Sequence, residues 1–116
     1  MFHYIDGGAD DERSLARNTS AFDDYEFLPR VLRDISQIDL STSILGGKID
    51  LPFFLAPTGM SRLFHRDKEL AVARAAGAYK TLYSLSTMGT TSIEDIAALG
   101  AGPFMFQVYI FRDRGL

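Results

Sequence analysis

The chain has 116 residues, of which 47% are hydrophobic, and its 12 basic and 15 acidic residues give a net charge of −3. This length and composition fit one small globular domain. The sequence shows no basic block, which argues against a nucleic-acid partner. It has no cysteine, which excludes a disulfide, a thiol nucleophile and a cysteine metal site.

The ends of the chain do not resemble targeting segments. The N-terminus lacks the basic and apolar regions of a signal peptide. Residues 2–5 are typical of the last turn of a helix that Gly7 and Gly8 close. The chain stops just after an apolar strand. We therefore expect a truncated chain.

Residues 1–50 are predicted to form a helix followed by a hairpin. The helix is expected over residues 10–25, with the acids of residues 10–12 in its first turn, where the helix dipole favours negative charge. Within residues 40–51, two short apolar segments flank a turn at Leu45, Gly46 and Gly47, which predicts a β-hairpin.

From Leu51 onward the pattern changes to alternating strands and helices. Apolar runs and helical spacing predict these elements in the order βαβαβ, which implies parallel strands joined by right-handed crossovers. Either a barrel or a doubly wound sheet has this α/β pattern. The apolar run of residues 51–57 is far shorter than the ~20 residues of a membrane span. The predicted strands are residues 51–57, 82–86 and 104–110, and the predicted helices are residues 67–78 and 92–99.

Two details of these elements are also predicted. Thr91 and Glu94 have the spacing of a capping box at the start of the second helix, and Gly100 follows its end. The phenylalanines of the strands are expected in the core. They are Phe53, Phe54, Phe104 and Phe106.

Each predicted strand ends on polar or small residues rather than apolar filler. In parallel α/β folds, ligands bind at the carboxyl ends of strands. Gly59 permits close approach of the backbone to a flat ligand. The amide of Gln107 can donate and accept at once, which suits the imide edge of a flavin or a nucleobase. The candidate site residues are Pro57, Thr58, Gly59, Ser86, Gln107 and Tyr109.

Each candidate also has a purely structural interpretation. Residues 57–59 could be only a turn, Ser86 a small filler, and Gln107 and Tyr109 a satisfied amide and an aromatic residue of the core. Tyr4 could simply pack the helix end. The two histidines, His3 and His65, have no metal-ligand spacing and are expected on the surface.

Six segments in this order resemble the FMN-dependent α-hydroxy-acid dehydrogenase/oxidase family, which includes flavin-linked L-lactate dehydrogenase, glycolate oxidase and mandelate dehydrogenase. The opening and the segment after residue 106 look most like respiratory L-lactate dehydrogenases of bacteria. The segments are Phe2–Glu12, Asn18–Phe22, Ala56–Met60, Leu85–Met88, Thr91–Asp95 and Phe106–Arg114.

The resemblance implies a (β/α)₈ TIM barrel with FMN at its C-terminal face, and such a barrel needs roughly 250 residues. Residues 51–116 would supply the first βαβαβ part, with about three strands, and residues 1–50 a segment that caps the barrel. The family's histidine base, carboxylate-binding arginine and phosphate loops correspond to positions beyond Leu116. The 116 residues alone are therefore expected to be inactive.

The resemblance also implies a role for each candidate. Tyr4 would bind the substrate carboxylate, and Tyr109 would bind the hydroxyl or keto oxygen of the substrate. Residues 57–59 would lie along the flavin ring, with a backbone N–H toward N5. Ser86 and Gln107 would bind the pyrimidine edge of the flavin.

The implied reaction is oxidation of an L-2-hydroxy acid to the 2-keto acid, with lactate as first candidate and glycolate or mandelate as others. Quinone, cytochrome or oxygen would accept the electrons. The family implies a homo-oligomer in the cytoplasm, with peripheral attachment to the inner face of the membrane as an option. Two residues depart from the family pattern: Lys80, where relatives have glycine, and Met88, which is often aromatic in the oxidases.

Two rival interpretations remain open from the sequence. One is another FMN-binding barrel enzyme, such as a relative of type 2 isopentenyl diphosphate isomerase. The other is a non-catalytic partial barrel that only associates with a partner.

Overall fold

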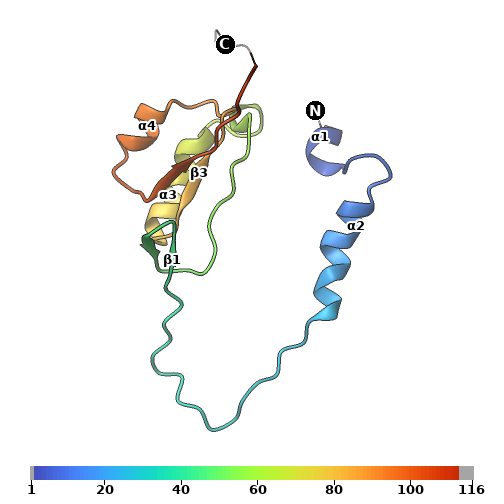
Figure 1. Ribbon diagram of the computed structural model, residues 1–116, viewed down its shortest axis with the longest axis vertical. Helices are drawn as coiled ribbons and strands as arrows, with labels where there is room; N and C mark the ends of the chain where they lie inside the picture. The colour runs from blue at the N-terminus through green and yellow to red at the C-terminus, as the bar shows by residue number, and fades with distance from the viewer. Residues whose placement is uncertain (1, 113–116) are drawn as a thin grey trace. The chain divides into compact units, whose positions relative to one another are not determined.

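The computed structural model describes residues 2–112 (Figure 1). The chain divides into two compact units, Met1–Ser36 and Gln37–Leu116. The predicted hairpin lies in the second unit. Among the described residues, no helix is long and apolar enough to cross a membrane.

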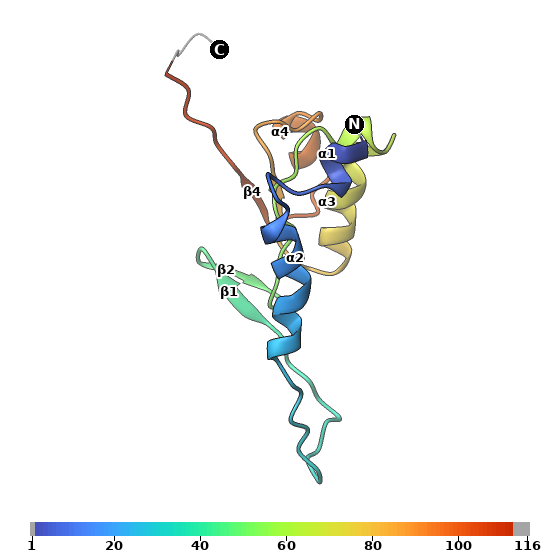
Figure 2. The same ribbon diagram turned by 90° about the vertical axis from the view of Figure 1, so that its right-hand side faces the viewer.

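The first unit is helical, as Figure 2 also shows. Helix α1 spans Phe2–Asp6, helix α2 spans Arg13–Ser20, and the short 3₁₀ helix η1 spans Ala21–Asp24. The predicted end of the first helix is confirmed, because the backbone N–H of Gly7 donates to the carbonyl of His3 at 3.0 Å.

The start predicted for the second helix is wrong. Helix α2 begins at Arg13, because Asp10 and Glu12 adopt left-handed conformations with φ of 51° and 55°. The acids of residues 10–12 therefore precede the helix instead of forming its first turn. Glu12 closes the preceding turn, since its Oε1 accepts a hydrogen bond from the backbone N–H of Gly8 at 3.1 Å.

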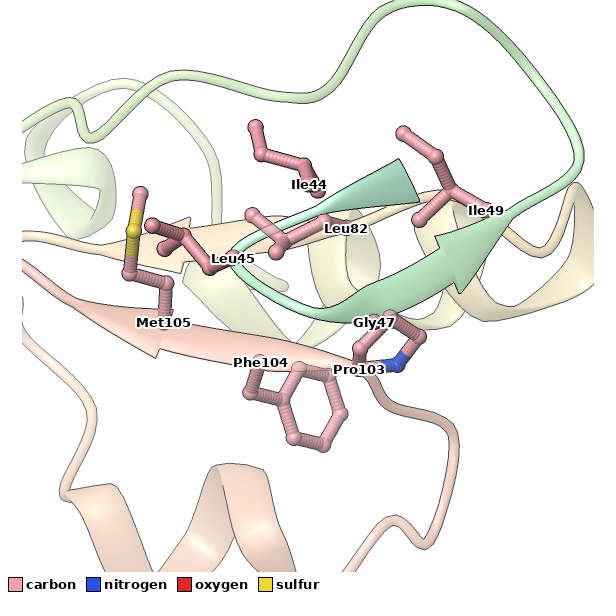
Figure 3. Close-up of a pocket in the computed structure, with 8 residues that line it drawn as sticks. All are labelled: Ile44, Leu45, Gly47, Ile49, Leu82, Pro103, Phe104 and Met105. Carbon is pink, nitrogen blue, oxygen red and sulfur yellow. The ribbon is translucent and has the colours of Figure 1, made fainter. Parts of the chain in front are cut away.

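The hairpin of the second unit is confirmed. Strand β1, Thr42–Ile44, pairs antiparallel with strand β2, Gly47–Ile49. Leu45 and Gly46 both have positive φ, at 49° and 80°, as the favoured two-residue hairpin turn requires. The hairpin lines a pocket of about 170 Å³ with the start of the parallel sheet (Figure 3).

The parallel strand order is also confirmed, although the strands are shorter than predicted. Strand β3, Tyr83–Leu85, pairs in parallel with strand β4, Phe104–Phe106. Leu55 forms a single parallel bridge with Tyr83, and this bridge is the part of the predicted strand 51–57 that pairs among the described residues.

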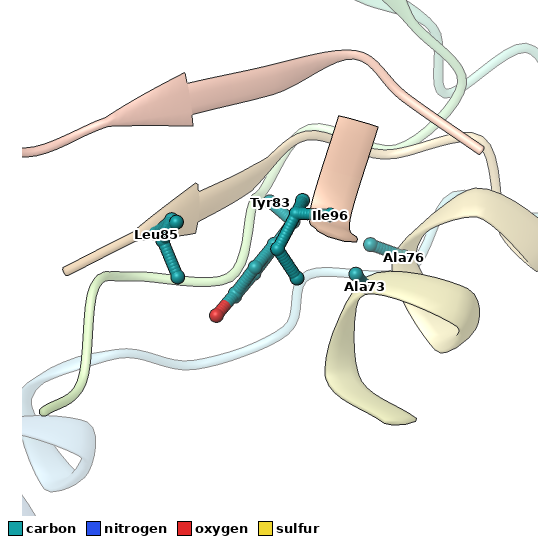
Figure 4. Close-up of a cluster of buried hydrophobic side chains, with 5 residues drawn as sticks. All are labelled: Ala73, Ala76, Tyr83, Leu85 and Ile96. Atoms are coloured by element: carbon teal, nitrogen blue, oxygen red, sulfur yellow. The ribbon is translucent and has the colours of Figure 1, made fainter. Parts of the chain in front are cut away.

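Two helices cover one face of this sheet. They are α3, Lys68–Ala78, and α4, Ile93–Ala97. The buried core between sheet and helices consists of Ala73, Ala76, Tyr83, Leu85 and Ile96 (Figure 4).

The prediction that all four strand phenylalanines are buried is wrong for three of them. Phe53, Phe54 and Phe106 are exposed by 58%, 36% and 41%, whereas Phe104 packs against the core. Phe53 instead lines an open apolar groove of about 450 Å³ beside α3.

The predicted capping box is wrong as well. The N-cap of α4 is Ser92, whose Oγ accepts a hydrogen bond from the backbone N–H of Asp95 at 3.1 Å. Thr91 lies one residue before this N-cap, and its hydroxyl instead donates to Oε2 of Glu69 at 2.7 Å.

Lys80 stands where relatives have glycine, which predicts a left-handed conformation, and its φ of 51° confirms this. This conformation costs a residue with a Cβ roughly 1–2 kcal/mol, and asparagine tolerates it better. The ion pair between Lys80 and Asp50 spans 3.4 Å, and both side chains are largely exposed, so it contributes little. We expect Lys80→Asn to raise the free energy of unfolding by about 0.5 kcal/mol in urea titrations. Lys48→Asn, on regular strand backbone, should not raise it, and a loss in Lys80→Asn would contradict the argument.

Candidate functional site

Three strand ends meet at one edge of the parallel sheet. The backbone N–H of Gln107 donates to the carbonyl of Leu85 at 2.8 Å, which ties the end of β4 to the end of β3. The backbone N–H of Met60 donates to the carbonyl of Met88 at 2.8 Å, which ties the loop after Leu55 to the loop after β3. These bonds place most of the predicted site in adjacent loops: Pro57, Thr58, Gly59, Ser86 and Gln107.

The side chain of Gln107 is held in one orientation. Its Oε1 accepts hydrogen bonds from the backbone N–H of Thr87 at 3.2 Å and from the hydroxyl of Ser86 at 3.4 Å. Because an N–H donor fixes which end is the oxygen, the amide NH₂ is the end left for a ligand. No acceptor for it lies within residues 2–112. Gln107 therefore offers donors, and not the donor and acceptor pair that the sequence predicts.

The hydroxyl of Ser86 braces this arrangement. The residue is 5% exposed. Its Oγ accepts the backbone N–H of Met88 at 3.1 Å while donating to Gln107. Ser86 thus fixes the loop after β3 and the amide at the end of β4 at the same time.

Gly59 lies where two loops touch. A Cβ added there would lie 2.9 Å from Cβ of Met88 and 3.7 Å from Oγ of Ser86, so glycine is needed for the contact between the two loops, and the approach to a flat ligand stays a prediction. The backbone N–H groups of Thr58 and Gly59 find no acceptor in the part of the chain that the structure describes. They are available to a ligand.

The two predicted substrate tyrosines lie in different units. Tyr109 follows the end of β4 and is 50% exposed. Its backbone N–H donates to the hydroxyl of Thr87 at 3.0 Å, and its ring makes an edge contact with Phe111. Tyr4 belongs to α1 of the first unit and is 68% exposed. The two histidines, His3 and His65, are on the surface as predicted.

The sequence analysis missed a buried carboxylate next to these loops. Glu69, in the first turn of α3, is 0% exposed. It accepts the backbone N–H of Thr90 at 2.8 Å, the hydroxyl of Thr90 at 2.9 and 3.0 Å, and the hydroxyl of Thr91 at 2.7 Å. A glutamate in a first helical turn is common for dipole reasons alone, and only the pair of threonines after the second strand could have indicated these bonds.

The environment of Glu69 shifts its titration. Burial raises the pKa of this carboxyl, but the hydrogen bonds from Thr90 and Thr91 outweigh burial and lower it from 4.5 to about 2. The same negative charge adds to burial in raising the pKa of the buried Tyr83 to about 12. Glu69 is therefore a charged, hydrogen-bonded group of the folded chain at neutral pH.

This shift predicts an acid-sensitive fold. Because the folded pKa of Glu69 lies below its ordinary value, its contribution is complete above pH 4.5 and is lost as pH falls toward about 2. At 1.36 kcal/mol per pKa unit, the loss is about 3 kcal/mol. Urea unfolding across this window should show a steeper loss of stability for the wild type than for Glu69→Gln. Parallel curves for the two proteins would show that Glu69 is not the responsible group.

Comparison with known proteins identifies the family. A family model described as FMN-dependent dehydrogenase matches residues 1–116. The chain belongs to this family. The resemblance inferred from the six sequence segments is thereby confirmed, and FMN is the family's cofactor.

The names of similar proteins refer to different substrates. The chain is 42% identical over its whole length to glycolate oxidase of Spinacia oleracea, of which it covers 31%. It is 47% identical over 97% of its length to a putative L-lactate dehydrogenase of Mycobacterium tuberculosis, of which it covers 28%. The chain thus spans about a third of the length of the curated relatives that it matches.

Solved structures of mandelate oxidase share the fold. One of them, which contains a monooxide FMN adduct, superposes with a TM-score of 0.87 at 39% identity, over 97% of this chain and 35% of that chain. Another matches with a TM-score of 0.86 at 40% identity, over 97% of this chain and 32% of that chain. The partial α/β fold described above therefore corresponds to about a third of a TIM-barrel flavoenzyme.

Proposed function

We propose that these residues form the first part of an FMN-dependent (β/α)₈ enzyme that oxidises an L-2-hydroxy acid to the 2-keto acid. Lactate is the first candidate substrate, with glycolate and mandelate as alternatives. The meeting of Gly59, Ser86 and Gln107 at one edge of the parallel sheet carries the proposal, because it gathers free hydrogen-bond donors in adjacent loops.

The donor set fits the flavin ring. The amide of Gln107 and the backbone N–H groups of Thr58 and Gly59 offer several donors around one loop cluster. A flat ring with carbonyl and nitrogen acceptors along its edge complements such a set. Pro57 and Gly59 would line the ring, and Gln107, braced by Ser86, would bind its pyrimidine edge. When bound, FMN supplies two-electron acceptance.

On the substrate side, two phenols have proposed roles. The hydroxyl of Tyr109 would donate to the hydroxyl or keto oxygen of the substrate, where it stabilises negative charge that develops during the reaction. Tyr4 would bind the substrate carboxylate. The family's histidine base and bidentate arginine are not among these roles, because their positions in the family correspond to residues beyond Leu116, and His3 and His65 do not match the base.

The partners are part of the same proposal. Quinone, cytochrome or oxygen would accept the electrons, and the complete protein would be a homo-oligomer. We propose a cytoplasmic location, with peripheral contact to the inner face of the membrane as an option. Its motivation is the likeness of the opening segment and the segment after residue 106 to respiratory L-lactate dehydrogenases.

A chimera tests the proposed function. Residues 1–116 would replace the aligned third of spinach glycolate oxidase, with which they share 42% identity. We expect the chimera to contain FMN and to reduce it with a 2-hydroxy acid without oxygen. The 116 residues alone should neither retain FMN nor bleach it with L-lactate. A folded chimera without FMN would instead favour a non-catalytic partial barrel. Stoichiometric, reducible flavin on the 116 residues alone would contradict the proposal that these residues form only part of the site.

A further inference from the structure

Glu69 is joined to the candidate site by a continuous series of hydrogen bonds. Its carboxylate accepts from the backbone and the hydroxyl of Thr90, and from the hydroxyl of Thr91. The hydroxyl of Thr90 in turn accepts the backbone N–H of Arg62 at 3.2 Å. One buried carboxylate on α3 therefore contacts the loop after β3 directly and, through a single hydroxyl, the 3₁₀ helix η2, Ser61–Leu63, that ends the segment after Leu55.

The same two loops are joined a second time, closer to the candidate site. Met60 donates its backbone N–H to the carbonyl of Met88 at 2.8 Å. Gly59 lies so close to Met88 that a Cβ added to Gly59 would be 2.9 Å from Cβ of Met88. Ser86, in the same loop as Met88, orients Gln107. A shift of residues 86–91 would therefore move all the proposed flavin-facing groups together.

The energetics favour a positioning role over simple stabilisation of the core. Glu69 is 0% exposed and packs beside no cationic partner in the described part of the chain. Its donors, Thr90 and Thr91, are loop residues, and hydrogen bonds to a carboxylate are stronger than neutral ones. A buried carboxylate loses much of its stabilisation when a hydrogen-bond donor moves away from it. This cost holds the donors in place.

We infer that Glu69 is a positioning residue that, through Thr90 and Thr91, holds residues 57–62 and 86–91 in the arrangement that receives the flavin. The inference rests on the proposed function for its ligand, but not for the contacts of Glu69. It assigns a functional consequence to a residue that touches neither substrate nor cofactor.

The test compares local loosening with general loss of stability in the FMN-containing chimera. The variants are Glu69→Gln and Thr91→Val, which removes a single hydroxyl donor, and the control is Ile96→Val, which weakens the core without removing a hydrogen bond to Glu69. Amide hydrogen exchange of the FMN-free proteins is measured by mass spectrometry, followed by FMN titration. For both variants we expect about tenfold faster exchange in residues 57–62 and 86–91, unchanged exchange in β3, and about tenfold weaker FMN binding. Ile96→Val should show neither local effect.

Three results would overturn the inference. They are unchanged exchange in the two loops, an equal rise across loops and β3, and faster loop exchange with unchanged FMN affinity. If Glu69→Gln does not fold, Thr91→Val decides the question alone. A wild-type chimera without FMN would overturn the proposed function, and loop exchange would still decide whether Glu69 holds the loops.

Discussion

Gly59→Val in the FMN-containing chimera should give a protein that is purified largely without flavin. The first added carbon would lie 2.9 Å from Cβ of Met88, a distance that real side chains do not tolerate, and valine adds two further methyl groups. The loop of residues 57–60 must then move away from the loop after β3. That displacement removes the backbone donors of Thr58 and Gly59 from their proposed ligand.

Matched variants separate this close contact from a general intolerance of valine. At Gly47 in the hairpin, an added Cβ would meet only the carbonyl of Ile44, at an ordinary 3.5 Å, so Gly47→Val should keep its flavin. Gly59→Ala adds only the carbon that clashes with Cβ of Met88, and it should therefore lose flavin as well. Because the clashing atom belongs to Met88, adding Met88→Gly should restore part of the flavin content of Gly59→Ala. The flavin-to-protein absorbance ratio measures each case. Full flavin in Gly59→Val would show that this loop does not contact the cofactor.

The sequence predicts those features of the fold that depend on neighbouring residues. Alternation of apolar runs with helical spacing is sufficient for α3, α4 and the parallel pairing of β3 with β4. The glycines after Leu45 are sufficient for the hairpin, although its turn is Leu45 and Gly46 alone, because Gly47 already pairs with Ile44. The left-handed backbone at Lys80 follows from comparison with a glycine in relatives.

Features that depend on contacts distant in the sequence could not be predicted in the same way. The helix begins one residue later than the capping box at Thr91 predicts, and the hydroxyl of Thr91 binds Glu69, 22 residues earlier. The orientation of Gln107 depends on Thr87, and the surroundings of Phe53 depend on residues of α3 far along the chain. Local composition contains no information on these partners.

The same limit explains what the sequence indicates about the site. The position of each candidate after a strand predicts that the candidates gather at one edge, and the structure places Gly59, Ser86 and Gln107 there. Their chemical state needs the structure, since only the bond from Thr87 shows that Gln107 has donors to offer. The roles of these residues toward the flavin stay predictions that the variants test.

Tyr109→Phe should leave flavin content unchanged and slow flavin reduction by about a hundredfold, since loss of one donor to a developing charge typically has this effect. The substitution keeps the ring, and with it the edge contact with Phe111 at 6.1 Å between ring centroids. The backbone bond from Tyr109 to Thr87 also persists. The substitution therefore removes only the interactions of the phenol hydroxyl.

Rapid mixing of the chimera with the hydroxy acid in the absence of oxygen measures this step directly, because flavin absorbance reports reduction and not reoxidation. Tyr79→Phe is the matched control, since Tyr79 is 70% exposed at the end of α3 and loses the same hydroxyl away from the strand ends. A slow reduction step in Tyr109→Phe with normal flavin content would place the phenol at the substrate. An unchanged rate of reduction would remove Tyr109 from the mechanism, and loss of flavin would move its contact from the substrate to the cofactor.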